Sequence, residues 1–149
     1  MKVKVFIDTN VFIDVLTGVR PSSEASSLVF EAVKRGYIEA FLSTQSIIDA
    51  SYAIRKELDQ DTFFKSVLWA CDHINITSID TFNVISAAQA RSGDYEDDAQ
   101  YACALANYCD FFITNDKKLI SRHGASHPKL GFCTPEGFVE RLKENGGNK

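Results

Sequence analysis

Proline and glycine are scarce in this sequence, at 3 and 8 of 149 residues. This scarcity excludes a collagen-like repeat and a disordered chain rich in these residues. Hydrophobic residues make up 45% and charged residues 24%, which is the balance of a globular domain with one buried core. We therefore expect one domain over residues 1–144 and a frayed tail over 145–149.

Long hydrophobic runs are also missing. No apolar segment approaches the roughly 20 residues that a membrane-spanning helix needs. The apolar stretch at the start is too short for a secretory signal, and Asp8 interrupts it. The sequence therefore predicts a soluble, cytoplasmic protein that does not enter a membrane.

Cysteine is present, but without the spacing of a metal site or the density of a disulfide scaffold. His123 and His127 are four residues apart, but Gly124 and Pro128 disfavour the helix that would align them, so we predict no zinc site. We expect buried free thiols at all four cysteines, which are Cys71, Cys103, Cys109 and Cys133.

An excess of positive charge is absent as well. The chain has 16 Lys and Arg against 20 Asp and Glu, and its formal net charge is −4. This charge argues against a broad basic surface that would hold nucleic acid through phosphate contacts alone. Nucleic-acid binding would have to depend on local basic clusters and on bound metal.

Strand-like and helix-like apolar patterns alternate along the chain. This alternation implies crossover connections, and it predicts an α/β fold. We expect a three-layer sandwich with a mainly parallel sheet of four to five strands flanked by helices. The predicted strands are 2–7, 38–43, 73–79, 111–114 and an edge strand at 130–133. The predicted helices are 10–16, 22–35, 44–58, 61–72, 81–91, 97–108 and a last one that begins near Pro135.

Four acidic residues stand near the positions where such a fold places its sites. Asp8 and Asp116 follow predicted strands, Asp97 begins a predicted helix, and Asp49 lies in the helix after the second strand. Sites in open parallel sheets form beyond the carboxyl ends of the strands. At about 5 Å, each pair of carboxylates would repel by roughly 3 kcal/mol at an effective dielectric of 20. Convergence would therefore need a cation, and Mg²⁺ or Mn²⁺ suits a sparse acidic cluster.

Each acid also has an ordinary structural explanation. Asp8 or Asn10 can cap the first helix, and Asp97 can interact with the dipole of its own helix. Asp116 can be a turn residue, and the helix around Asp49 can turn this side chain to solvent. Spacing alone leaves both explanations open.

Three segments together resemble the PIN domain family: 5–11 (VFIDTNV), 94–104 (DYEDDAQYACA) and 113–117 (ITNDK). Their order and separations match across nearly the whole chain. The segment 134–138 (TPEGF) is similar to the one that closes many bacterial members. The resemblance implies a Mg²⁺- or Mn²⁺-dependent nuclease that cuts RNA. It also implies that the chain is the toxin of a toxin–antitoxin pair and that it forms homodimers.

The resemblance also assigns individual residues. It places Asp8, Asp97 and Asp116 on the metal-binding acids of the family, and Asn10 and Thr114 on the polar supports of that centre.

The second family acid, which is commonly Glu, corresponds to Asp49. The side chain of Asp49 is one methylene shorter, so we expect a contact bridged by water. Glu96, next to Asp97, is a reserve ligand.

As a mechanism, we hypothesise that a metal-bound water, oriented by Asp49, attacks phosphorus without a side-chain nucleophile. Lys117 is the best candidate for guiding phosphate, although each basic residue also suits a solvated surface. The other candidates are Arg20, Arg55, Lys56, Lys118 and Arg122.

Two alternatives to a nuclease stay open. The first is a catalytically weak PIN-like module that binds RNA or a protein partner. The second is a phosphatase-like hydrolase with Asp8 as its nucleophile, which would need Asp where Asn10 stands.

Overall fold

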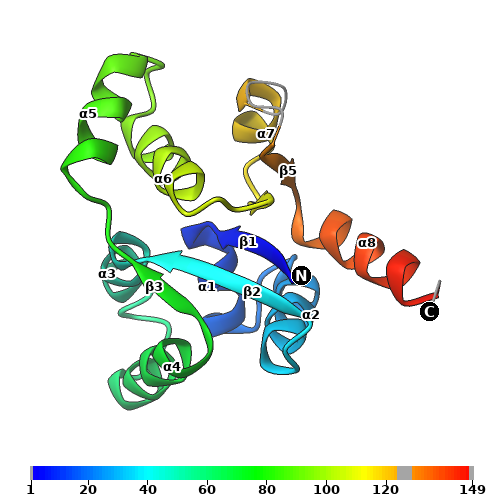
Figure 1. Cartoon of the computed structure of the whole chain (residues 1–149). Coiled ribbons are helices and arrows are strands. Elements are labelled where there is room, and N and C mark those ends of the chain that lie inside the picture. The colour runs from blue at the N-terminus through cyan, green and yellow to red at the C-terminus, as the bar shows by residue number, and fades with distance from the viewer. Residues whose placement is uncertain (1, 124–128, 148–149) are drawn as a thin grey trace.

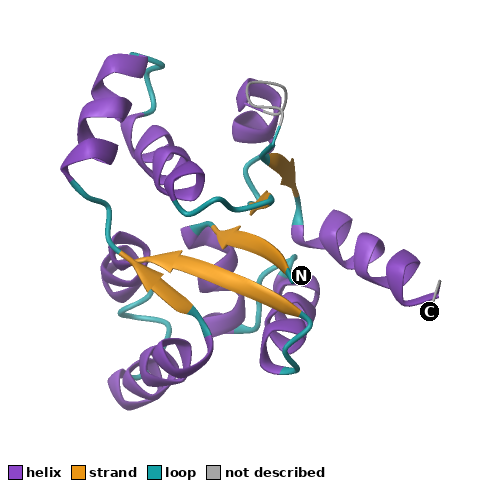
Figure 2. Cartoon of the chain, in the orientation of Figure 1, coloured by secondary structure: helices purple, strands orange, loops and turns teal. Residues whose placement is uncertain are grey.

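The computed structural model describes residues 2–123 and 129–147 (Figures 1 and 2). Its five strands form one sheet in the order β3-β2-β1-β4-β5, and every neighbouring pair is parallel. This confirms the predicted α/β class. The strands are β1 (Val3–Ile7), β2 (Ile38–Ser43), β3 (Asn75–Thr77), β4 (Phe111–Ile113) and β5 (Gly131–Cys133).

Helices connect the strands, and their ends have clear local causes. Gly18 has a positive φ of 69° and ends α1, while the side chains of Asp59 and Asp80 accept backbone N–H groups and cap α4 and α5. The helices are α1 (Thr9–Thr17), α2 (Ser23–Lys34), α3 (Thr44–Ala53), α4 (Gln60–His73), α5 (Thr81–Ala90), α6 (Tyr95–Ala106), α7 (Lys117–His123) and α8 (Pro135–Gly147).

The sheet separates two hydrophobic cores, because successive strand residues point to opposite faces. Val5 and Ile7 of β1 belong to a core shared with α1, α2, α3, α4 and α8. Phe6, between them, belongs to a second core shared with α6 and α7. Figure 1 shows α1 to α4 on one side of the sheet and α5 to α7 on the other. The predicted three-layer sandwich is confirmed.

The direction in which the chain crosses the sheet changes once. From β1 it proceeds outward to β2 and β3, and it then returns across the sheet to β4, beside β1. In open parallel sheets, such a reversal leaves a crevice beyond the carboxyl ends of the two central strands. Asp8 directly follows β1 and Thr114 directly follows β4, so both residues lie at this crevice.

Several helix boundaries differ from the prediction. The helix expected over 44–58 ends at Ala53, and residues 54–57 form turns. Helix α6 begins at Tyr95 instead of Asp97, because Asp94 caps it. Helix α7 was not expected at all. Helix α8 continues to Gly147, beyond the expected domain end at residue 144, while residues 148 and 149 lie outside the described part.

The prediction of buried thiols is correct for Cys103 and Cys109, whereas Cys133 is only half-buried. It is wrong for Cys71, which is exposed because it follows the buried Ala70 on α4. Neighbouring helical residues point about 100° apart, so Cys71 turns away from the core. All four thiols are free, and burial raises the pKa of Cys109 to about 12. His127 and the side chain of His123 lie outside the described residues.

Within residues 2–123 and 129–147, no helix combines the length and the apolar character needed to cross a bilayer.

Candidate metal-binding site

Asp8 is the most firmly held acid of the site. Its side chain is buried, with one oxygen accepting the Thr9 N–H at 2.8 Å and the other accepting the Thr114 hydroxyl at 2.7 Å. Asn10 Nδ2 donates to that second oxygen at 3.3 Å. A carboxylate can accept about four hydrogen bonds, so these contacts leave room for a cation. Asp8 therefore caps α1 and still offers a ligand position.

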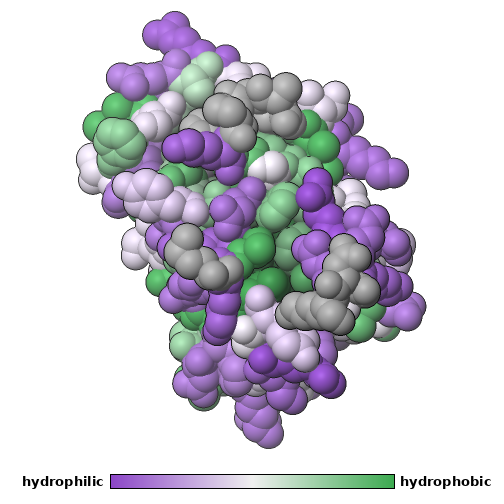
Figure 3. All heavy atoms as spheres, turned by 45° about the vertical axis from the view of Figure 1, so that its right-hand side comes forward, coloured by the Kyte–Doolittle hydropathy of each residue, from purple (hydrophilic) through white to green (hydrophobic). Residues whose placement is uncertain are grey.

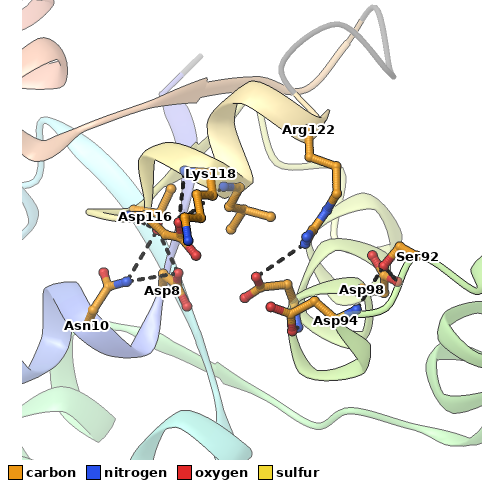
Figure 4. A network of polar contacts seen from close by, with 11 residues as sticks. Asp8, Asn10, Ser92, Asp94, Asp98, Asp116, Lys118 and Arg122 are labelled. Carbon is orange, nitrogen blue, oxygen red and sulfur yellow. Dashed lines mark hydrogen bonds and ion pairs between the residues drawn. The ribbon is translucent and has the colours of Figure 1, made fainter.

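Asp116 reaches the same crevice from the start of α7. One of its carboxylate oxygens accepts the N–H groups of Lys118 at 2.9 Å and Leu119 at 3.2 Å. Figure 4 shows Asp116 beside Asp8. The pKa of Asp8 is raised, chiefly because burial disfavours its charged form and also because Asp116 repels it. Hydrogen bonds from Thr114, Thr9 and Asn10 oppose this shift.

Asp97 completes this group from the first turn of α6. Its carboxylate accepts a hydrogen bond from Arg122 Nη2 at 3.3 Å. Burial, the Asp94 side chain, and the charges of Asp8 and Asp116 raise the pKa of Asp97 to about 7. Asp97 therefore feels both other acids. Its neighbour Asp98 is buried and hydrogen-bonded to Ser92 instead.

Asp49 and Glu96 form a second acidic pair beside Asp8. Asp49 is half-buried on α3 and accepts a hydrogen bond from Gln45 at 2.8 Å. The pKa of Glu96 is raised by partial burial, by the charges of Asp49 and Asp8, and by a hydrogen bond with Asp49. Glu96 thus faces the acids, as expected for a reserve ligand.

These acids form an open arrangement. In the described residues, no three side chains of His, Cys, Asp or Glu are gathered closely enough to hold a metal ion directly. They nevertheless repel one another, since Asp8 raises the pKa of both Asp97 and Glu96. Mg²⁺ keeps several waters and usually takes one or two protein carboxylates. An open group of carboxylates therefore fits hydrated Mg²⁺ or Mn²⁺ better than an ion that needs a closed cage.

Comparison with known families identifies the domain. A family model described as the PIN domain matches residues 4–118. The chain belongs to the PIN domain family. The match spans Asp8, Asp49, Asp97 and Asp116, so all four acids lie within the segment that defines this PIN domain.

Solved structures share the fold of this PIN domain. Mycobacterium tuberculosis VapC20, a sarcin-ricin loop cleaving toxin, has a TM-score of 0.67 at 7% identity over 79% of this chain and 94% of that chain. VapBC2 from Rickettsia felis, bound to a promoter DNA fragment, has a TM-score of 0.63 at 13% identity, over 88% of this chain and 98% of that chain. A toxin–antitoxin complex from Klebsiella pneumoniae has a TM-score of 0.62 at 18% identity, over 88% of this chain and 97% of that chain. Among curated protein sequences, none matches.

A prominent groove of this PIN domain lies away from the acids. It runs between α2 and α8, where Leu28, Val139 and Leu142 line it together with Val3 and Ile38 at the amino ends of β1 and β2. Figure 3, turned toward the α8 side, shows hydrophobic surface in a hollow in the middle of this face. The groove is largely apolar and lies at the amino ends of the strands, whereas the acids lie at the carboxyl ends. We therefore place the candidate site by the chemistry of the acids.

The predicted phosphate-guiding residues divide into two groups. Helix α7 carries Lys117, Lys118 and Arg122 beside the acids, and all three are exposed. The two other candidate arginines, Arg20 and Arg55, have partners elsewhere. Arg55 lies over the Tyr52 ring, 3.9 Å from its centroid, and Arg20 pairs with Glu57 at 3.2 Å. Lys56 is exposed in the turn after α3.

Two buried polar residues of the site were not predicted. Asp14 on α1 accepts hydrogen bonds from Ser26 on α2, at 2.9 Å, and from the Asn115 side chain. The backbone N–H of Asn115 in turn donates to the Asn10 side chain at 3.1 Å. Gln100 is buried on α6. Both residues are polar groups among the mostly apolar buried residues of their helices, and this was the available signal.

Proposed function

We propose that this PIN domain is a Mg²⁺- or Mn²⁺-dependent endoribonuclease that hydrolyses RNA phosphodiester bonds. The observation that carries the proposal is that Asp8, Asp97 and Asp116, from three distant segments, lie within range of one another's charge around the crevice between β1 and β4. Gathered carboxylates repel one another, and a divalent cation is the natural balancing charge. Such a cation would also attract RNA phosphate to an acidic protein.

Each acid has a distinct role in this proposal. When bound, the metal would lower the pKa of a water for attack on phosphorus and stabilise the leaving oxygen. Asp8, held by Thr114 and Asn10, would be the central ligand, and Asp97 and Asp116 would complete the set.

The remaining polar groups would orient the reactants. Asp49, together with Glu96, would orient the attacking water. Lys117, at the exposed start of α7, would bind the phosphate. No side-chain nucleophile is needed.

We further propose that the chain is the toxin of a toxin–antitoxin pair. The support is the fold shared with VapC20 and with two toxin–antitoxin complexes. Large hydrophobic side chains are also exposed on several helices, which is surface that a partner or a second copy could cover. The test is to express the chain with the product of a neighbouring small reading frame. Copurification and relief of growth arrest are expected, and sedimentation would report dimers.

The nuclease proposal is tested with purified protein and a panel of structured and single-stranded RNAs in Mn²⁺, Mg²⁺ or EDTA. Cleavage that requires metal and is lost in Asp8→Asn and Asp116→Asn is the expected result. Asp61→Asn is the matched control, because Asp61 pairs with Lys65 on the exposed surface of α4. Equal cleavage by all variants would identify a contaminating nuclease and reject the proposal.

A catalytically weak module that binds RNA or protein is the second candidate. The observation in its favour is that, among the described residues, no three acids are gathered closely enough to hold a metal ion directly. Binding of Mn²⁺ and RNA without cleavage of any RNA in the panel would select this candidate.

A further inference from the structure

A buried network of hydroxyl and amide groups joins three helices next to the acids. Gln100 of α6 is only 1% exposed, and its Nε2 donates to Ser46 Oγ at 2.7 Å and to Thr9 Oγ1 at 3.3 Å. The Ser46 and Thr9 hydroxyl oxygens are 2.7 Å apart. Ser43, which caps α3, donates to Ser46 Oγ at 3.1 Å. The network therefore links α1, α3 and α6 through direct contacts.

Each helix of this network also carries an acid of the candidate site. Thr9 directly follows Asp8. On α3 and α6, the network residues lie three positions from Asp49 and Asp97, respectively. Residues three apart lie on the same side of a helix, so each network contact is close to the acid of its own helix. These hydrogen bonds thus hold together the parts of the three helices that carry the acids.

The network has an energetic cost. Gln100 Oε1 is buried without a hydrogen-bond partner among the described residues. A buried carbonyl oxygen in this state is unfavourable, because it has lost its hydrogen bonds with water and gained none in the protein. The Thr9 and Ser46 hydroxyls can pair with each other without the amide, and Ala99, Cys103 and Ala104 beside Gln100 are buried and mostly apolar. An apolar side chain at position 100 would therefore serve the stability of the fold at least as well.

We propose that Gln100 is a positioning residue of the metal centre, whose amide holds α6 at a fixed separation from the acid-bearing parts of α1 and α3. This inference rests on the nuclease function proposed above. The amide contacts hydroxyl groups instead of carboxylates, so Gln100 acts through the helices. Without it, the acids would remain, but they would hold a less defined geometry before the metal binds.

The test is Gln100→Met, which keeps the length of the side chain and removes both the donor and the unpaired oxygen. Mn²⁺ binding, measured by calorimetry on the full chain, is expected to weaken about tenfold, the lower end of the loss known for groups that orient metal ligands. The metal-free Tm should stay the same or rise. Gln89→Met is the matched control, because Gln89 is exposed on α5, and neither quantity should change.

Ser46→Ala removes the same contact from the α3 side and should weaken Mn²⁺ binding to a similar extent. Unchanged Mn²⁺ affinity in Gln100→Met would overturn the inference while leaving the proposed function intact. A loss of affinity that occurs only with a large drop in metal-free Tm would assign Gln100 an ordinary packing role, and would also overturn it. Failure of the folded wild-type chain to bind Mn²⁺ would instead overturn the proposed metal centre and this inference with it.

Discussion

The Asp8 carboxylate accepts hydrogen bonds from the Thr9 N–H, the Asn10 amide and the Thr114 hydroxyl. The first contact caps α1, and the last ties the end of β1 to the end of β4. The structural explanation of Asp8 as a helix cap and its proposed role as a ligand are therefore compatible. The contacts that stabilise the helix start also fix the direction of the carboxylate toward Asp116.

Asp8→Asn should separate these two roles. Asn is as good a helix cap as Asp, so the fold should be kept. The buried charge beside Asp116 disappears, so metal-free Tm should stay equal or rise. Cleavage should fall by on the order of 10²-fold or more, the scale of losing one electrostatic group in an active site. Thermal denaturation and initial cleavage rates in Mn²⁺ measure these effects, and a large drop in Tm would contradict the argument.

Arg122→Gln should tighten Mn²⁺ binding by several-fold. The Arg122 guanidinium pairs with Asp97 at 3.3 Å. Its positive charge would therefore repel a metal ion bound to the same carboxylate. The gain is limited because Arg122 is one-third exposed and solvent screens the pair. Calorimetric titration measures the change. Arg35→Gln is the control, since Arg35 forms an exposed ion pair with Glu31 on α2. Weaker Mn²⁺ binding in Arg122→Gln would mean that the arginine orients Asp97 for the metal.

At the residue scale, sequence reasoning located the acids because each follows a recognisable local pattern. The Asp8 and Asp116 motifs come at strand ends, and these positions are visible in the apolar pattern. The partners of the acids were harder to find. Asp14 and Gln100 depend on contacts with other helices, and no local pattern shows which buried polar group has a partner. The ion pair of Arg122 joins two helices that the sequence alone does not place together.

At the element scale, the start of α6 determines how Asp97 is presented. Asp94 caps the helix by accepting the Asp97 N–H at 3.2 Å, and its side chain and charge help to raise the pKa of Asp97. The cap places three acidic residues in the first turn, where the helix dipole stabilises negative charge. The dipole thereby offsets part of the repulsion within this acidic segment.

Asp94→Ala should have two separable effects. Loss of the cap should lower the free energy of unfolding by about 1 kcal/mol. Loss of the Asp94 carboxyl should lower the pKa of Asp97 from about 7 toward its ordinary range. Denaturant titration and NMR titration of the side-chain carboxyl groups measure the two effects. Asp59→Ala removes an equivalent cap from α4 and should reproduce only the first effect. An unchanged pKa of Asp97 in Asp94→Ala would refute the influence of Asp94 on that pKa.

The strands were predictable as elements, whereas several helix ends were not. Strand β1 is rich in Val, Ile and Phe, and its residues pair on both sides within the sheet. Helix α7 has only seven residues and begins after Asp116, whose carboxylate accepts two N–H groups of its first turn. A segment of this length is too short for helical apolar spacing to be recognised in the sequence. Caps made by single side chains thus account for boundaries that apolar periodicity cannot give.

At the scale of the whole molecule, the site is a product of strand order. The alternating pattern predicts parallel strands, but not the order β3-β2-β1-β4-β5. That order places β4 beside β1, which brings Asp116 to Asp8 although the two residues are 108 positions apart in the chain. The sequence motifs indicated which acids belong together, and the topology supplies the physical reason why they meet.

The gathered acids should make the metal-free protein less stable as pH rises. Asp97, Asp8 and Glu96 have raised pKa values in the folded state, so the folded protein binds more protons than the unfolded chain. The free energy of unfolding therefore falls as pH rises from about 4, and the Asp97 contribution is lost above about pH 7. An acid with a lowered pKa, such as Asp59, behaves in the opposite way. Its contribution to stability is lost only as the pH falls through its folded-state pKa.

The difference in Tm between wild type and Asp97→Asn isolates the contribution of Asp97, because all other titratable groups are present in both proteins. In EDTA, the advantage in Tm of Asp97→Asn over wild type should grow between about pH 5 and pH 8. In millimolar Mn²⁺ the order should reverse at the upper end, since an ion bound to the ionised acids stabilises only the wild-type folded state. A Tm difference between the two proteins that stays constant across this range in EDTA would show that Asp97 ionises freely, because an acid with an ordinary pKa is already ionised in both the folded and the unfolded state. The acids would then not be close enough to share a metal.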